Sequence, residues 1–214
     1  LGQLLGPLPV GPDQIAVVID QLDDFVRRQK GRDQLVLLDR ASGQQLHVID
    51  SPRDLNSSEG LVKVGNRLYV PIHDEATNGK ELELLVFEER AGRYQFMESL
   101  SLLDRYPIGS SATIELLDQF RWNGQALGPV LFIRHLSGWI IVPAKSPQQV
   151  IRVPVPDPTV PPVAVGPNAG RVMIAWKDVL SPDRRFGFLV TYTMYLLEYS
   201  AHDPTLWIYD FVEG

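Results

Sequence analysis

Apolar and polar positions alternate along this chain in short runs, and the runs recur in groups with a period of roughly 50 residues. The clearest group spans residues 60–102, where VKVGNRLYVPIHD, ELELLVFEERAG and RYQFMESLSL follow one another. Alternation over a few residues, with frequent Val, Ile, Tyr and Phe, is typical of strands whose one face is buried. Three such runs joined by polar turns predict a meander of antiparallel strands.

Turn residues separate the runs at regular places. Asp39–Gly43, Gly65–Asn66 and Asn123–Gly124 each combine residues that favour a chain reversal. Units of this size stack into propellers or barrels, whose functions lie in surface loops. We therefore expect an all-β fold of antiparallel meanders, propeller-like, with about four units.

Four segments organise the chain. Residues 1–12 interleave Leu with Gly and Pro, which neither a helix nor a ladder accommodates, and predict an extended arm. Residues 13–153 hold units one to three, and residues 168–214 hold the fourth unit. Between them, residues 154–167 contain a density of proline that favours an extended connector.

One short helix is predicted near residues 20–30. Leu22, Phe25 and Val26 recur at helical spacing, and aspartates precede the basic residues as the helix dipole favours. A second helix, at residues 114–120, is the alternative to a strand there, because Ile114 and Leu117 also fit helical spacing.

The hairpin QLVLLDRASGQQLHVID in unit one resembles the blade hairpins of quinoprotein-like β-propeller repeats. In those repeats a strand ends in Asp, a turn with Gly follows, and an apolar strand returns; here these are Leu37–Asp39, Gly43 and Leu46–Ile49. Units two and four have the same layout, at 86–97 and 196–209. The resemblance implies that each hairpin forms the outer half of a blade.

Composition and charge exclude several classes of function. The chain has 214 residues, 44% of them hydrophobic, and a net charge of −6, so it can build a core but repels phosphate backbones. We expect no direct nucleic-acid partner. There is no cysteine, which leaves the compartment open, and the longest apolar run, from Phe186, is too short and too polar to span a membrane.

Candidate chemistry is sparse. His73, Asp74 and Glu75 combine metal-ligating residue types, but neighbours on a strand point to opposite faces, so a solvated loop is the favoured interpretation. Acidic residues at strand ends, namely Asp39, Asp50, Asp74 and Asp178, would serve a hydrolase or lyase only if they met in a central channel. No catalytic, metal or cofactor motif is recognisable.

Aromatic residues concentrate near the C-terminus and are predicted to form either part of the core or a binding surface. The surface candidates are Trp176, Tyr192, Tyr195, Tyr199, Trp207 and Tyr209.

Three functions remain open. The favoured hypothesis is a non-catalytic interaction or structural module that binds other protein chains in a larger assembly, with a virion tail or capsid-associated component as its specific version. The alternatives are a carbohydrate- or small-ligand-binding propeller, and a propeller hydrolase or lyase.

Overall fold

The computed structural model describes residues 4–19, 33–53, 55, 60–74, 81–103, 112–135, 138–154, 171–195 and 200–213. For residues 4–6, 73–74, 81, 154, 171–178, 191–195 and 200–205 it describes the backbone alone. The predicted helix at residues 20–30 lies outside these ranges, as does nearly all of the connector predicted at 154–167.

The described residues form fifteen strands and no helix, which confirms the predicted all-β fold. The strands are β1 (Leu4–Pro9), β2 (Gln14–Ile19), β3 (Gln34–Asp39), β4 (Gln45–Ile49), β5 (Val62–Val64), β6 (Arg67–Asp74), β7 (Glu81–Arg90), β8 (Arg93–Leu103), β9 (Ala112–Trp122), β10 (Gln125–His135), β11 (Gly138–Pro143), β12 (Ile151–Pro154), β13 (Arg171–Leu180), β14 (Phe186–Tyr195) and β15 (Ser200–Asp210).

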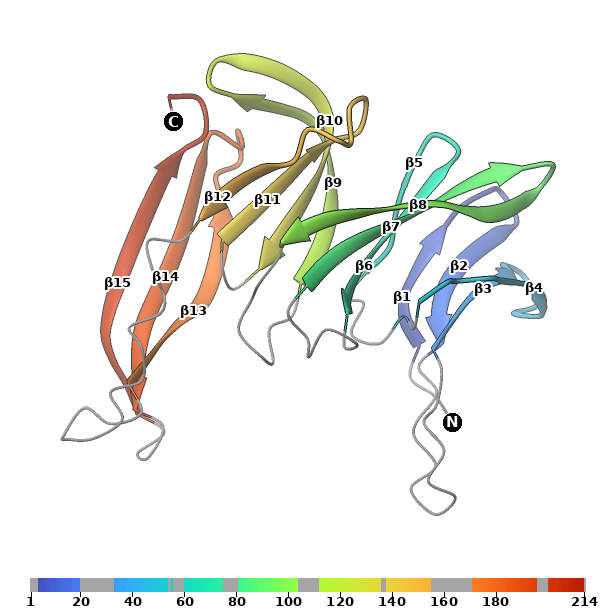
Figure 1. Cartoon of the computed structure of the whole chain (residues 1–214), viewed down its shortest axis with the longest axis horizontal. Coiled ribbons are helices and arrows are strands. Elements are labelled where there is room, and N and C mark those ends of the chain that lie inside the picture. The colour runs from blue at the N-terminus through green and yellow to red at the C-terminus, as the bar shows by residue number, and fades with distance from the viewer. Residues whose placement is uncertain are drawn as a thin grey trace.

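These strands make four antiparallel sheets, each built from consecutive strands in chain order. Sheet 1 contains β1–β4, sheet 2 contains β5–β8, sheet 3 contains β9–β12 and sheet 4 contains β13–β15. The sheets follow one another across Figure 1 from blue to red, and the first and last lie at opposite ends of the row. Sheets 1 to 3 have four strands each and sheet 4 has three among the described residues. Successive meanders of about four strands are the blades of a propeller, so the fold is β-propeller-like, with four units.

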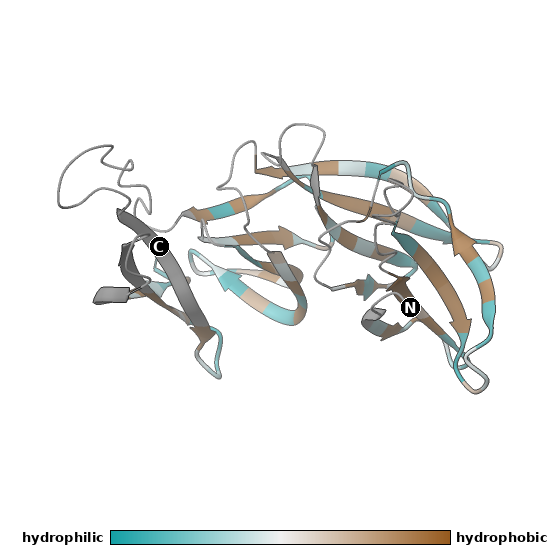
Figure 2. Cartoon of the chain, turned by 90° about the horizontal axis from the view of Figure 1, so that it is seen from below, coloured by the Kyte–Doolittle hydropathy of each residue, from teal (hydrophilic) through white to brown (hydrophobic). Residues whose placement is uncertain are grey.

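Successive sheets pack face to face through three apolar clusters. Leu35 of sheet 1 packs in one cluster with Leu85 of sheet 2, and Leu84 of sheet 2 packs in the next with Leu131 of sheet 3. A third cluster joins sheet 3 to sheet 4 and to Phe211 just beyond β15. Figure 2 shows brown, hydrophobic residues along much of the described strands, with teal, hydrophilic residues in the turns and at intervals within the strands.

Sheet 2 is buried on both faces because it lies between two other sheets. In β6, Leu68 and Val70 face sheet 1, whereas Tyr69 between them faces sheet 3. The predicted turn at Gly65–Asn66 is present and pairs Val62 with Tyr69. The residues that face sheet 3 are therefore even-numbered before the turn, as Val62 is, and odd-numbered after it, as Tyr69 is. A simple alternation continued through the hairpin would assign Val62 and Leu68 to one face; the structure places them in different clusters.

Three predicted features differ in the structure. The hairpin expected in unit four at 196–209 is wrong, because residues 200–210 form the single strand β15, which pairs with β14. Residues 4–9, expected in an arm outside any ladder, pair antiparallel with β2 as the edge strand β1. An edge strand tolerates proline because one of its sides has no ladder to complete, and a shift in register between Leu5 and Leu8 accommodates Pro7. The alternative helix at residues 114–120 is wrong, since strand β9 runs through this stretch and pairs with β10 at residues 112–117 and 120–122.

Candidate binding surface

The inner face of sheet 4 is part of the core. Leu189 and Phe211 are buried there, and Trp207 and Tyr209 pack partly buried against the same cluster. Gly187 makes this packing feasible, because a Cβ at that position would lie 2.7 Å from Cζ of Phe211 and 3.0 Å from Cη2 of Trp139. The inner face of sheet 4 is therefore fixed to sheet 3 by aromatic packing.

The outer face of sheet 4 is apolar and exposed. Ladder pairing places Val179 opposite Phe188, Phe188 opposite Ile208, and Val190 opposite Leu206, so side chains from all three strands share this face. Val179 is 48% exposed, Leu206 57% and Ile208 62%. Among the described residues, the other exposed large apolar side chains lie on sheets 1 and 2, and they are Leu46 at 49%, Phe96 at 36% and Met97 at 40%.

A polar rim borders one end of this outer face. Arg185 donates from Nε and Nη2 to Oδ2 of Asp210, at 2.9 and 2.6 Å, and from Nη2 to Oε1 of Glu213 at 3.0 Å. These hydrogen bonds hold the pKa of Asp210 below its ordinary value, chiefly through Arg185, and raise the pKa of Arg185. The guanidinium also covers the Phe186 ring, 4.9 Å from its centroid. An apolar centre with a hydrogen-bonded charged border is the usual anatomy of a protein interface.

The predicted aromatic surface is only partly described. Trp207 and Tyr209 are half-buried on the inner face, where Tyr209 stacks on Trp122 with ring centroids 5.9 Å apart and an interplanar angle of 8°. Burial raises the pKa of the Tyr209 hydroxyl. Trp176, Tyr192 and Tyr195 lie on strands β13 and β14 with only their backbone described, and Tyr199 lies outside the described residues.

Sequence reasoning missed the residues that are most exposed on sheet 4. In TLWIYD, strand alternation places Leu206 and Ile208 on one face and Trp207 and Tyr209 on the other. This alternation could have indicated from the sequence that the strand has two different apolar faces. Trp207 and Tyr209 follow the core alternative given for the aromatic residues, because their larger rings fill the space against sheet 3.

The other candidates do not come together in the part of the chain that is described. Asp39 serves its own turn: its Oδ1 accepts from the Ser42 amide at 2.7 Å and hydroxyl at 2.6 Å, and the Ser42 hydroxyl is the main cause of its lowered pKa. Asp50 is exposed, and the backbone alone is described for His73, Asp74 and Asp178. Among the described residues, no group of three or more His, Asp and Glu side chains could hold a metal ion.

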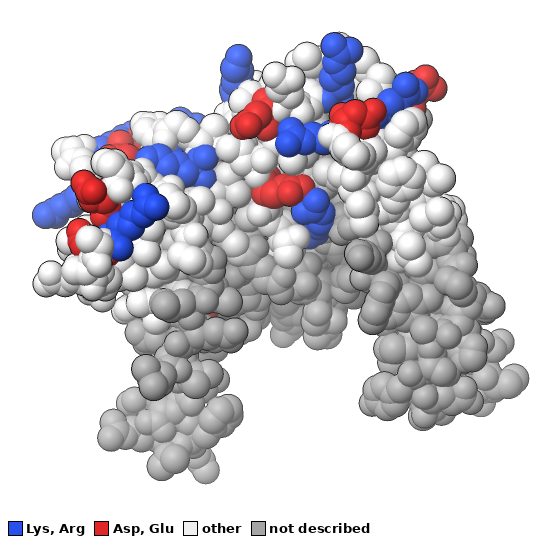
Figure 3. Space-filling view, turned by 180° about the vertical axis from the view of Figure 1, so that it is seen from behind, with Lys and Arg blue, Asp and Glu red and all other residues white. Residues whose placement is uncertain are grey.

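Charge is mixed on the surface. Figure 3 shows Lys and Arg interspersed with Asp and Glu on one face of the molecule, over the described residues. Several of these charges are paired, including Arg67 and Arg90 with Glu88. The described chain also has no helix with the length and hydropathy of a membrane span.

Comparison with known proteins identifies no family for this chain. No family model matches it, and no curated protein matches it. Among solved structures it is similar to the Dos1 propeller, with 12% identity and a TM-score of 0.47 over 96% of this chain and 47% of that one. It is also similar to the periplasmic gluconolactonase PpgL of Pseudomonas aeruginosa, with 13% identity and a TM-score of 0.30 over 93% of this chain and 70% of that one. The chain thus spans about half the length of the Dos1 propeller.

Proposed function

We propose that this chain is a non-catalytic interaction module that joins an assembly of protein chains through the outer face of sheet 4. The observation that carries the proposal is the exposure of Val179, Leu206 and Ile208 together on one sheet face whose opposite face is packed. Exposed apolar patches rimmed by polar residues mark interaction sites in soluble proteins.

The chemistry of the partner follows from how the other sheets pack. Each of the three contacts between successive sheets sets an apolar sheet face against another apolar sheet face. The outer face of sheet 4 continues this series without a fifth sheet against it in the described residues. Its partner is therefore an apolar face of a β-sheet, at the spacing of about 10 Å that packed sheets adopt. A tail or capsid-associated role in a virion would be one case of such an assembly.

The purified chain provides a direct test, because the outer face on a second copy is itself an apolar sheet face. Sedimentation velocity from about 10 to 500 µM should show reversible association that weakens at least tenfold in the double variant Leu206→Lys, Ile208→Lys, since lysine places charges in the contact. Leu46→Lys is the matched control, because Leu46 is 49% exposed but lies on sheet 1.

The proposal fails if the wild-type chain remains a monomer over this range. It also fails if Leu46→Lys weakens association as much as the sheet 4 variant does, because the contact would then not be specific to the outer face of sheet 4.

A further inference from the structure

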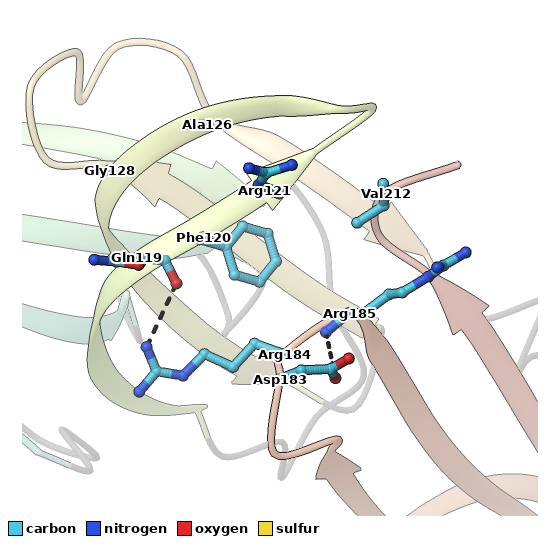
Figure 4. A pocket seen from close by; sticks show the side chains of 9 residues that line it. All are labelled: Gln119, Phe120, Arg121, Ala126, Gly128, Asp183, Arg184, Arg185 and Val212. Atoms are coloured by element: carbon cyan, nitrogen blue, oxygen red, sulfur yellow. Dashed lines mark hydrogen bonds between the residues drawn. The ribbon is translucent and has the colours of Figure 1, made fainter.

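A pocket of about 460 Å³ lies between sheet 3 and the turn that joins β13 to β14 (Figure 4). This volume is within the range of small-molecule sites. Its lining residues are Gln119, Phe120 and Arg121 of β9, Ala126 and Gly128 of β10, Asp183, Arg184 and Arg185 of the turn, and Val212.

Two of the charged groups in the pocket, Asp183 and Arg185, already form hydrogen bonds with neighbouring residues. Asp183 accepts from the Ser181 hydroxyl at 2.6 Å and from the Arg185 amide at 3.2 Å, and the Ser181 contact is the largest cause of its lowered pKa. Arg185 is bound to Asp210 and Glu213, and Figure 4 shows its side chain extending away from that of Arg184.

Arg184 is different. Its φ of 59° lies in the left-handed region, where Gly or Asn is the usual residue, so a long cationic side chain stands at a backbone position that disfavours it. A guanidinium has five N–H donors. The single hydrogen bond of the Arg184 side chain to the described residues runs from Nη1 to the Gln119 carbonyl oxygen, at a long 3.4 Å.

Arg121 supplies a second cation to the same pocket. It is exposed, follows Gln119 by two positions on β9, and has no ion pair or hydrogen bond among the described residues. Ala126 and Val212 give the pocket an apolar side, and Phe120 packs in the core cluster at its edge.

We propose that this pocket binds a small oxyanion ligand whose carboxylate or phosphate oxygens accept hydrogen bonds from Arg184 and Arg121, with its carbon part against Ala126 and Val212. The planar fork of a guanidinium matches both kinds of oxyanion. Because the chain carries a net charge of −6, attraction comes from these two local cations and will weaken as salt rises.

Isothermal titration calorimetry at constant ionic strength tests the proposal. Citrate and inorganic phosphate are the separate probes, and chloride, added as sodium chloride, is the reference anion that should give no binding heat. One of the two probes should bind saturably, with one site per chain. Binding of citrate would indicate a carboxylate site, and binding of phosphate would indicate a phosphate site. Arg121→Gln should weaken binding at least tenfold, whereas Arg93→Gln, at an exposed turn of sheet 2, should leave it unchanged.

Arg184→Gly separates binding from folding. Glycine relieves the left-handed backbone, so this variant should melt at or above the wild-type temperature while losing the titration heat. Unchanged binding in Arg184→Gly would overturn the proposal, as would the absence of saturable binding of either probe up to about 10 mM.

Discussion

Phe211 is the residue whose removal should most weaken the attachment of sheet 4. Its side chain is 0% exposed. Its ring centroid lies 5.3 Å from that of Phe120, 5.3 Å from that of Tyr209 and 5.5 Å from that of Trp139. Its backbone adds two links, accepting from the Asn123 amide at 2.9 Å and donating to the Arg185 carbonyl at 2.8 Å.

The expected magnitude follows from this burial. Truncating a buried Phe to Ala typically costs 3–5 kcal/mol, and the Phe211 site is too enclosed by rigid rings to collapse, so we expect about 4 kcal/mol for Phe211→Ala. Phe211→Leu keeps most of the volume and should cost about 1.5 kcal/mol. Urea unfolding followed by tryptophan fluorescence measures both, since Trp122 and Trp139 lie beside the Phe211 ring.

Ile208→Ala is the control for this measurement. Ile208 is close in sequence but 62% exposed, so its truncation should change the free energy of unfolding by less than about 0.5 kcal/mol. A loss below about 1 kcal/mol for Phe211→Ala would refute the view that this ring joins sheets 3 and 4.

Three further predictions concern neighbouring contacts. Gly187→Ala should destabilise the chain by about 2 kcal/mol in urea unfolding, because its Cβ would overlap buried aromatic rings that cannot move freely, and a loss under about 0.5 kcal/mol would contradict that geometry. Arg152→Met should lower the free energy of unfolding by about 1 kcal/mol in the same assay, because Arg152 donates a hydrogen bond to the Leu102 carbonyl at 2.5 Å and so links β12 to the edge strand β8. An unchanged free energy of unfolding would mean that water replaces this hydrogen bond. Asp210→Asn should lower the melting temperature at pH 6, because the hydrogen bonds from Arg185 hold the folded-state pKa of Asp210 below its ordinary value of 3.8. The stabilisation is complete above pH 3.8 and is lost as pH falls below 3.8 through the folded-state pKa, so the difference in melting temperature between variant and wild type should narrow on acidification. A difference that widens on acidification would have the wrong sign.

Local pattern predicted much of this fold. Turn chemistry located the reversals correctly: Gly43, Gly65 and Gly124 all have positive φ. Two of the three outer-half hairpins implied by the resemblance are β3–β4 and β7–β8, which are the last two strands of their sheets. The third, at 196–209, is not formed as expected, because residues 200–210 are the single strand β15. These features were predictable because each depends on a few adjacent residues.

Relationships between sheets were less predictable. Alternation shows that Leu206 and Trp207 lie on different faces of a strand, but not which face meets a neighbouring sheet. That outcome depends on Gly187 and Phe211, which lie on other segments and make room for the aromatic side of β15. The arginine pocket likewise combines β9 with the turn at 181–185, a proximity that no local pattern encodes.

The central claim is that the outer face of sheet 4 is the contact surface, and site-specific disulfide cross-linking tests it most directly. The chain has no cysteine, so a single introduced thiol reports on one position without background. Under mild oxidation, Ile208→Cys should form a covalent dimer rapidly, whereas Leu46→Cys, on sheet 1, should remain monomeric. Equal cross-linking at both positions, or faster cross-linking through Leu46→Cys, would contradict the account.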